Sequence, residues 1–294
     1  MIRALIARLR QKHRTLAYPK RVPPLPDRWR FRPAIATERC VDGCRACVEA
    51  CPTGAIQVGA APPAIDLGLC IFCPECAAAC PAQAITYSSD HRLATSARED
   101  LIVGGGSEGP RLARALDDRA RRLFGRSLKL RQVSAGGCNG CEADVNVLGT
   151  IVYDLSRFGV QFVASPRHAD GLLITGPVTR NMELALRKTY ESVPSPKLVI
   201  AVGACAISGG PYVGHREALD GAASVVPVDL YVPGCPPHPL TILDGLLRLL
   251  GRLEEGRSPG AQGGRSGGGG AGGEGGAGVA GGKGGEGAQG GEGA

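Results

Sequence analysis

Long apolar runs and export signals are both missing from this sequence. No apolar run approaches the roughly 20 residues that cross a bilayer. The first residues, MIRALIARLRQKH, carry too many charges for a secretory signal, and no twin-arginine pair precedes an apolar stretch. We therefore expect the chain to stay in a reducing cytosol, where its 12 cysteines would ligate metal more readily than they would form disulfides.

Acidic residues are scarce at the N-terminus, because residues 1–32 hold ten Lys or Arg and only Asp27. The net charge of +7 therefore belongs to this arm, and the remaining chain is close to neutral. This uneven charge excludes a uniformly basic nucleic-acid binder, and we expect no nucleic-acid partner. Ile2, Leu5, Ile6 and Leu9 form one apolar stripe against basic residues. The stripe predicts an amphipathic helix that lies on a membrane surface or packs on its own protein.

The segment from Gly256 to Ala294 is mostly glycine and has almost nothing to bury. Its glycines do not recur at every third position, which excludes collagen, so we predict a disordered tail over residues 256–294. Gly104, Gly106 and Gly109 fit the G-x-G-x-x-G pattern of nucleotide-binding proteins, but only a very short apolar run precedes them. We interpret residues 101–126 as a linker followed by a basic helix that Pro110 opens.

Eight cysteines between residues 40 and 80 form two runs, CVDGCRACVEACP and CIFCPECAAACP. The second run has the C-x2-C-x2-C-x3-C-P spacing of bacterial ferredoxins, in which three close cysteines hold one [4Fe–4S] cluster and the fourth reaches the other cluster. The pattern predicts two ligand sets, namely Cys40, Cys44, Cys47 and Cys80, and Cys70, Cys73, Cys76 and Cys51. Zinc knuckles are the alternative, which the doubled Cys-Pro ending disfavours.

The first run departs from the ferredoxin spacing, because three residues separate Cys40 from Cys44. The extra length must bulge, and Gly43 makes a bulge feasible. A strand-like segment, TGAIQV or AQAITYS, follows each run, so the two halves form an internal pseudo-two-fold repeat. We predict a two-cluster, ferredoxin-like α+β domain over residues 33–100.

The last four cysteines are spread widely, with the spacing C-x2-C-x63-C-x29-C. Each follows an apolar, strand-like segment that ends in small residues, and helical stretches are expected at 142–158, 181–193 and 239–254. Alternating strands and helices predict a flavodoxin-like parallel sheet covered on both faces, over residues 127–255. Because ligands gather at the carboxyl ends of such strands, these cysteines should converge there. The converging residues are Cys138, Cys141, Cys205 and Cys235.

The four converging thiols leave two chemistries open. A thioredoxin-like dithiol would need only Cys138 and Cys141, whereas zinc and a [4Fe–4S] cluster would each use all four. The neighbouring ferredoxin pattern favours a third [4Fe–4S] cluster over zinc. The sequence therefore predicts three clusters in one chain.

Residues 127–250 resemble the small electron-transfer subunit of energy-converting [NiFe] hydrogenases of the formate hydrogenlyase type, a family homologous to the cluster-bearing 20 kDa subunit of complex I. The similar segments are LRQVSAGGCNGCE, YDLSRFGVQFVASPRHADGLLITGPVT, PKLVIAVGACAISGG and VDLYVPGCPPHPLTILDGLL. Residues 1–100 resemble the two-cluster ferredoxin subunit of the same complexes and of complex I, so the chain looks like a fusion of two neighbouring subunits. Cys138 and Cys141 are separated as in hydrogenase small subunits, whereas the complex I protein has adjacent cysteines.

The resemblance implies an iron–sulfur electron relay inside a multi-subunit oxidoreductase, at the cytoplasmic face of the cell membrane and peripheral to it. The expected partners are a hydrogenase large subunit (complex I 49 kDa-like) and membrane-arm subunits, with no substrate chemistry on this chain itself. The alternative that it implies is a complex I-like NADH:quinone oxidoreductase subunit, whose last cluster reduces quinone.

Three polar residues near the last four cysteines are candidates for tuning their cluster. Arg167 and His168 follow the second strand of the sheet, where a cation would stabilise a reduced cluster or simply bind backbone or a partner. Glu142 follows Cys141 and would either aid proton movement or cap the helix that begins there. We interpret His91, His215 and His238 as surface or loop histidines.

Overall fold

The computed structural model describes residues 2–26, 29–57, 63–104 and 109–253. All of these fall within one compact unit, residues 1–260. The glycine-rich tail lies outside the described residues, as does Gly106 of the G-x-G-x-x-G pattern. No helix in the described part of the chain is long and apolar enough to cross a membrane.

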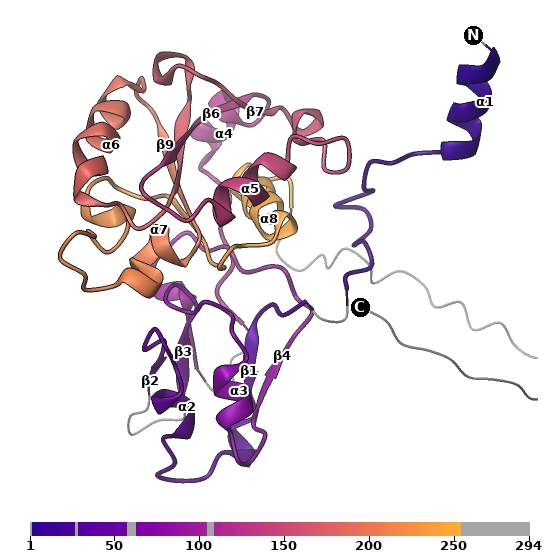
Figure 1. The fold of residues 1–294 in the computed structure, drawn as a ribbon. Helices are drawn as coiled ribbons and strands as arrows, with labels where there is room; N and C mark the ends of the chain where they lie inside the picture. The colour runs from indigo at the N-terminus through magenta and orange to yellow at the C-terminus, as the bar shows by residue number, and fades with distance from the viewer. Residues whose placement is uncertain (1, 27–28, 58–62, 105–108, 254–294) are drawn as a thin grey trace, which may run out of the picture. The chain divides into compact units, whose positions relative to one another are not determined.

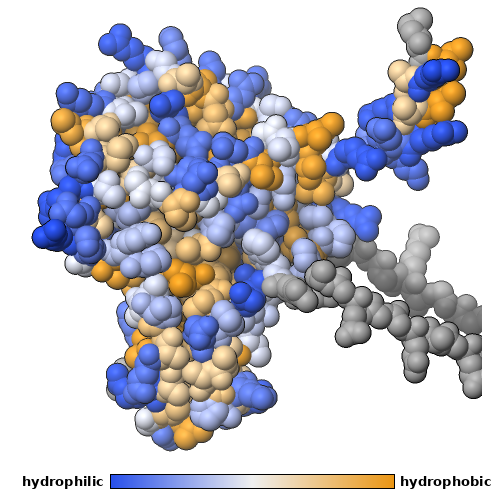
Figure 2. Space-filling view, viewed as in Figure 1, coloured by the Kyte–Doolittle hydropathy of each residue, from blue (hydrophilic) through white to orange (hydrophobic). Residues whose placement is uncertain are grey.

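The N-terminal arm begins with α1 (Ile2–Gln11), the amphipathic helix that the sequence predicts. None of its residues is buried, and its apolar stripe is exposed. Figure 2 shows apolar side chains on one side of this helix and basic side chains around the rest. After this helix the arm is attached to the rest of the protein by a hydrogen bond, in which Leu16 N–H donates to Val152 O at 2.8 Å.

The cysteine-rich half consists of short elements (Figure 1). Its helices are α2 (Ala46–Glu49) and α3 (Glu75–Ala79). Its strands are β1 (Pro33–Ile35), β2 (Ile56–Gln57), β3 (Ala64–Asp66), β4 (Ile85–Tyr87) and β5 (Ile102–Gly104). They pair antiparallel as β1-β4 and β2-β3-β5, so β5 extends this half past the expected boundary at residue 100.

The second half is built on a five-stranded sheet in the order β10-β9-β8-β6-β7, with every pairing parallel. The strands are β6 (Leu128–Ser134), β7 (Val160–Phe162), β8 (Gly171–Thr175), β9 (Leu198–Val202) and β10 (Leu230–Val232). Counted along this half, the order is 2-1-3-4-5, which is the flavodoxin-like order. The predicted fold class is confirmed.

Helices cover both faces of this sheet (Figure 1), because alternate residues of its buried strands point to opposite sides. The helices of this half are α4 (Asp118–Phe124), α5 (Gly140–Val147), α6 (Arg180–Ser192), α7 (Ala204–Ser208) and α8 (Pro239–Leu249). Leu173 and Ile200 pack with α5 and α8 in one core. Leu172 and Val199 pack with α6, α7 and apolar residues of the cysteine-rich half in the other. The core on the α6 and α7 face is thus shared by the two halves.

Three expected helices are shorter than the sequence predicts, and the one expected over 239–254 ends at Leu249. The helix expected over 142–158 ends at Val147, and after a turn only the 3₁₀ segment Leu155–Phe158 follows. The intervening Thr150, Ile151 and Val152 are β-branched and disfavour helix. The basic helix expected from Pro110 begins at Asp118, where the Asp117 side chain accepts a hydrogen bond from Ala120 N–H at 2.8 Å.

Candidate metal centres

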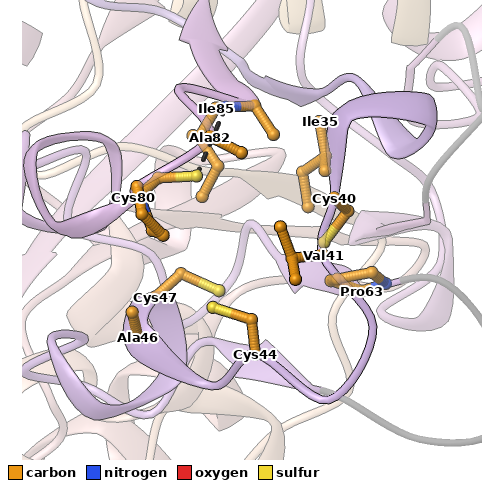
Figure 3. Close-up of a pocket in the computed structure, with 12 residues that line it drawn as sticks. Ile35, Cys40, Val41, Cys44, Ala46, Cys47, Pro63, Cys80, Ala82 and Ile85 are labelled. Carbon is orange, nitrogen blue, oxygen red and sulfur yellow. Dashed lines mark hydrogen bonds between the residues drawn. The ribbon is translucent and has the colours of Figure 1, made fainter.

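The first predicted ligand set lies around one recess of the cysteine-rich half. Cys40, Cys44, Cys47 and Cys80 all line this recess, which encloses about 400 Å³ of space, part of it open to solvent. Figure 3 shows the four sulfurs turned toward the space between them, with apolar side chains around them. Ala84 N–H donates to Cys80 Sγ at 3.3 Å. The thiols predicted as one set therefore lie together, while their role as ligands stays a prediction.

Gly43 absorbs the extra residue between Cys40 and Cys44. It adopts a φ of +73°, in the left-handed region, and Cys44 N–H closes a turn on Val41 O at 3.1 Å. A Cβ at Gly43 would meet nothing within 4 Å, so the left-handed backbone and not crowding selects glycine here. The turn lets Cys44 face the recess beside Cys40 despite the longer spacing.

The second predicted set lines a separate recess of about 310 Å³, again partly open solvent. Its thiols are Cys51, Cys70, Cys73 and Cys76. Ala55 N–H donates to Cys51 Sγ at 3.2 Å, and Phe72 N–H donates to Cys70 Sγ at 3.3 Å. Burial raises the pKa of Cys70 to about 12, and the negative charge of the neighbouring thiols adds to the rise.

Two hydroxyl side chains beside the second set were not singled out from the sequence. Tyr87 donates a hydrogen bond to Cys73 O and lies 3.6 Å from Cys76 Sγ, and Thr53 Oγ1 lies 3.8 Å from Cys51 Sγ. Their positions in the repeat are the signal that could have found them, because Thr53 directly follows one Cys-Pro pair and Tyr87 ends the strand that follows the other.

The last four cysteines converge at the carboxyl edge of the parallel sheet. Cys138 and Cys141 follow β6, Cys205 lies in α7 after β9, and Cys235 follows β10. The neighbours β6 and β8 form the switch point of the sheet, where ligands bind in this fold.

Burial and neighbouring thiols raise the pKa values of this third set. Burial raises the pKa of Cys141, and Cys205 and Cys235 are its next two causes. Burial likewise raises the pKa of Cys205 to about 11, again with Cys235 next. A Cβ at Gly203, whose φ is +94°, would lie 2.5 Å from Cys141 Sγ, so only glycine leaves room for this sulfur.

The second and third sets are neighbours. Burial raises the pKa of Cys235, and after Cys138 the next cause is Cys73 of the second set. Ser208, at the end of α7, donates to Gly68 O at 2.7 Å, and Gly68 lies two residues before Cys70. Arg98 pairs with Asp66 at 2.6 Å beside the same turn. One hydrogen bond thus joins the two halves at this junction, and an ion pair within the cysteine-rich half lies beside it.

The three expected tuning residues differ in placement. Glu142 is buried beside Cys141, where its carboxylate accepts hydrogen bonds from Ser134 Oγ at 2.6 Å and Thr175 Oγ1 at 2.7 Å. Burial acts to raise the pKa of Glu142, but the two hydroxyls outweigh it and lower the pKa below its ordinary value. Arg167 and His168 are exposed after the edge strand β7. Of the three, Glu142 is therefore the one that lies buried beside the thiol set, and its role in tuning a cluster there stays a prediction.

A buried polar network joins the N-terminal arm to α8. Tyr18 donates to Asp244 Oδ1 at 2.7 Å, Arg248 pairs with the other oxygen of Asp244 at 2.6 Å, and His91 Nε2 lies 3.2 Å from the Tyr18 hydroxyl. His91 lies in a loop, which is one of the two alternatives predicted for it, but at 3% exposure it is not a surface histidine. His238 is half-buried and stacks edge-on to Trp29. Its Nδ1 accepts from Leu240 N–H, which caps α8.

Sets of four thiols fit [4Fe–4S] clusters chemically. Thiolates packed this closely repel one another unless they share cationic iron, and cysteine thiolates are the ligands such clusters use. Within the described ranges, no group of three or more His, Cys, Asp or Glu side chains is placed to hold a single metal ion. In two of the sets the thiols surround a recess rather than a point.

Two family models match the chain, and they match its two halves. Residues 39–84 match the 4Fe-4S dicluster domain, and residues 138–249 match the model described as NADH ubiquinone oxidoreductase, 20 Kd subunit. The chain therefore contains a domain of the kind that holds two [4Fe–4S] clusters.

Three similar proteins are named as parts of a formate hydrogenlyase, a membrane-bound hydrogenase and a respiratory membrane complex. Formate hydrogenlyase subunit 7 of Escherichia coli is 44% identical over 46% of this chain and 54% of its own length. The probable membrane-bound hydrogenase subunit mbhJ of Pyrococcus furiosus is 41% identical over 48% of this chain and 87% of its own length. A chain of the membrane-bound sulfane sulfur reductase, an archaeal respiratory membrane complex, is 36% identical, with a TM-score of 0.41 over 48% of this chain and 78% of its own.

This chain spans about half of the E. coli relative but most of the P. furiosus one. The match to the second is long and close enough to fix the family of the sheet half. The protein belongs to the family of the 20 kDa subunit of NADH ubiquinone oxidoreductase, with a 4Fe-4S dicluster domain ahead of it in the same chain.

Proposed function

We propose that this protein is an electron-relay subunit of a membrane-associated hydrogenase complex of the formate hydrogenlyase type. The named relatives are subunits of a formate hydrogenlyase and of a probable membrane-bound hydrogenase, which supports the assignment. The chain itself makes and breaks no substrate bonds. It is active only within a multi-subunit oxidoreductase.

In this proposal three sets of four cysteines each hold one [4Fe–4S] cluster. The sets are Cys40, Cys44, Cys47 and Cys80, then Cys51, Cys70, Cys73 and Cys76, and then Cys138, Cys141, Cys205 and Cys235. When bound, the clusters supply one-electron redox chemistry. The observation that carries the proposal is the contact between the two halves beside the thiol sets, where Ser208 Oγ donates to Gly68 O at 2.7 Å, because it supports the sheet half as the continuation of the dicluster half.

The third set leaves two of its thiols exposed, which supports a partner that covers them. Cys138 and Cys235 are exposed, as is Pro236 beside them. A cluster held there would meet solvent and oxygen unless another subunit closed the site. The partner we propose is a hydrogenase large subunit, similar to the 49 kDa subunit of complex I, with membrane-arm subunits alongside it.

The N-terminal arm supports a peripheral position on the cytoplasmic face of the membrane. The apolar side chains of α1 are all exposed, and its charged residues are all basic. Such a helix binds an anionic lipid surface without spanning it. Deleting residues 2–12 should release the complex from membranes at high salt, whereas retention at every salt concentration would contradict this position.

A second candidate function is that of a complex I-like subunit whose last cluster reduces quinone. The observation that favours it is the match of residues 138–249 to a family model from NADH ubiquinone oxidoreductase. The partner large subunit discriminates the two candidates. Cysteine pairs that ligate nickel in that subunit would support the hydrogenase, and their absence would support the quinone reductase.

The relay itself is tested by replacing Cys235 with serine in the assembled complex. We expect electron paramagnetic resonance to retain the signals of the two ferredoxin-like clusters, while electron delivery to the partner is lost. Cys51→Ser is the matched variant, and it should remove a signal of the dicluster half instead. Full activity of Cys235→Ser would place the third cluster off the pathway and overturn the proposal.

A further inference from the structure

The two ligand sets of the dicluster half differ in their hydroxyl neighbours. In the second set, the Tyr87 hydroxyl lies 3.6 Å from Cys76 Sγ and Thr53 Oγ1 lies 3.8 Å from Cys51 Sγ. In the part of the chain that the structure describes, no side-chain hydroxyl forms a hydrogen bond with a thiol of the first set, whereas Ala84 N–H does. Backbone amides therefore serve both sets, and side-chain hydroxyls serve one.

The sequence repeat encodes this difference. The first half reads Cys51-Pro-Thr-Gly-Ala-Ile-Gln-Val and the second reads Cys80-Pro-Ala-Gln-Ala-Ile-Thr-Tyr. Thr53 in the first half thus corresponds to Ala82 in the second, and Tyr87 in the second corresponds to Val58 in the first. Because the fourth cysteine of each run crosses to the other set, both hydroxyls end beside the same four sulfurs.

Cluster binding fixes the direction of the hydrogen bond between Tyr87 and Cys76. A thiolate that ligates iron has no proton to donate, so the phenol is the only donor in this contact. The phenol donates its single proton to Cys73 O, and Cys76 Sγ, at 3.6 Å, is a second acceptor of the same ligand loop for that proton. Tyr87 is held there by β4, whose pairing with β1 places Tyr87 opposite Pro33.

We propose that Tyr87 is a positioning residue that raises the reduction potential of the second cluster through its hydroxyl. Reduction adds negative charge, and a donor aimed at a ligand sulfur stabilises that charge. Burial acts in the opposite direction, because it removes water from the charged cluster, and Cys76 is only 8% exposed. The hydroxyl offsets this cost at the cluster whose Cys73 neighbours the sheet half. The inference rests on the second ligand set of the proposed function.

The test is Tyr87→Phe in the full chain, followed by anaerobic redox titration with electron paramagnetic resonance detection. We expect the second cluster to become harder to reduce, with the ratio of reduced to oxidised cluster falling roughly fivefold at a fixed ambient potential. The first cluster should titrate as before. Thr53→Val should shift the same cluster in the same direction by less, because its contact is longer.

Thr86→Val is the matched control, because it removes an exposed hydroxyl from the same strand and should shift neither cluster. Iron content of each variant separates this inference from the proposed function. If Tyr87→Phe retains the iron of the unaltered chain and the second cluster titrates unchanged, Tyr87 only fixes the Cys73 loop and the inference is overturned. If the unaltered chain lacks the second cluster, the ligand set of the proposed function fails instead.

Discussion

The two halves of this molecule bring four thiols together by different means. In the cysteine-rich half, the strands have two or three residues and the helices four or five, and the thiols lie in these short helices or on the tight loops beside them. In the sheet half, β8 and β9 have five residues each and are buried throughout, and the thiols come from three separate strand ends. Local spacing sets the first arrangement, and long-range topology sets the second.

This difference predicts which half needs its cofactor in order to fold. Among the residues that the structure describes, the cysteine-rich half has no apolar core apart from the one that it shares with the sheet half, where Ile65 and Leu101 are buried, so we expect iron–thiolate bonds to hold its loops in place. The sheet half has a core on each face, with Leu173 and Ile200 on one and Leu172 and Val199 on the other. We therefore expect the sheet half to keep its fold when its thiols hold no iron.

Removing iron should therefore affect the two halves differently, and this difference in hydrogen exchange is the largest effect we expect. Anaerobic chelation should expose the backbone amides of residues 40–51 and 70–80 to hydrogen exchange, because their loops lose their cross-links. The amides of β9 should stay protected. Equal loss of protection in both halves would show that the sheet also needs its cluster to fold.

Truncating a core side chain of the sheet should instead destabilise the sheet half. Leu173→Ala removes a side chain that is fully buried in β8, and we expect the free energy of unfolding of the sheet half to fall by about 2–5 kcal/mol. Leu184→Ala, on the 61% exposed side chain of α6, is the control and should change it by less than about 0.5 kcal/mol. Denaturant unfolding measures both, and equal effects would contradict the assigned core.

The thiol sets of the two halves can be predicted from the sequence by different kinds of reasoning. In the cysteine-rich half, the spacing alone groups the thiols, because the ferredoxin pattern assigns three cysteines of one run and the fourth of the other run to each set. In the sheet half, strands such as β8 and β9 are predictable from apolar runs, and convergence follows from the rule for parallel sheets. The helix α7, which carries Cys205, was not predicted, since five residues give no periodic signal.

Long-range contacts set the features that the sequence does not predict. Burial of His91 depends on Tyr18, which is 73 residues away, and on Asp244 beyond it. The Tyr87 hydroxyl meets Cys76 only because β4 pairs with β1. Neither contact has a local pattern, so pairing and packing had to be known first.

A smaller effect should come from pH at the edge of the sheet half. Burial lowers the pKa of His238 to about 4, and the nearby His91 adds to the lowering. The unfolded chain binds this proton near its ordinary pKa of about 6.5, so stability should fall as pH drops from about 6.5 toward 4. His238→Asn retains an acceptor for Leu240 N–H and should weaken this pH dependence.

Thermal unfolding under anaerobic conditions at several pH values checks the effect of His238. His215→Asn, on an exposed side chain, should retain the pH dependence of the unaltered chain. The same slope in the His238→Asn and unaltered chains would show that His238 is free to take up its proton in the folded state.

We propose that the cysteine-rich half and the sheet half hold the same cofactor, with one [4Fe–4S] cluster in each of three thiol sets. Anaerobic iron and acid-labile sulfide assays on the unaltered chain test it most directly, together with the same assays on Cys205→Ser. We expect about twelve irons and about twelve sulfides per chain, and about four fewer of each in the variant. About eight irons in the unaltered chain, with no further loss in Cys205→Ser, would contradict a cluster at the sheet edge.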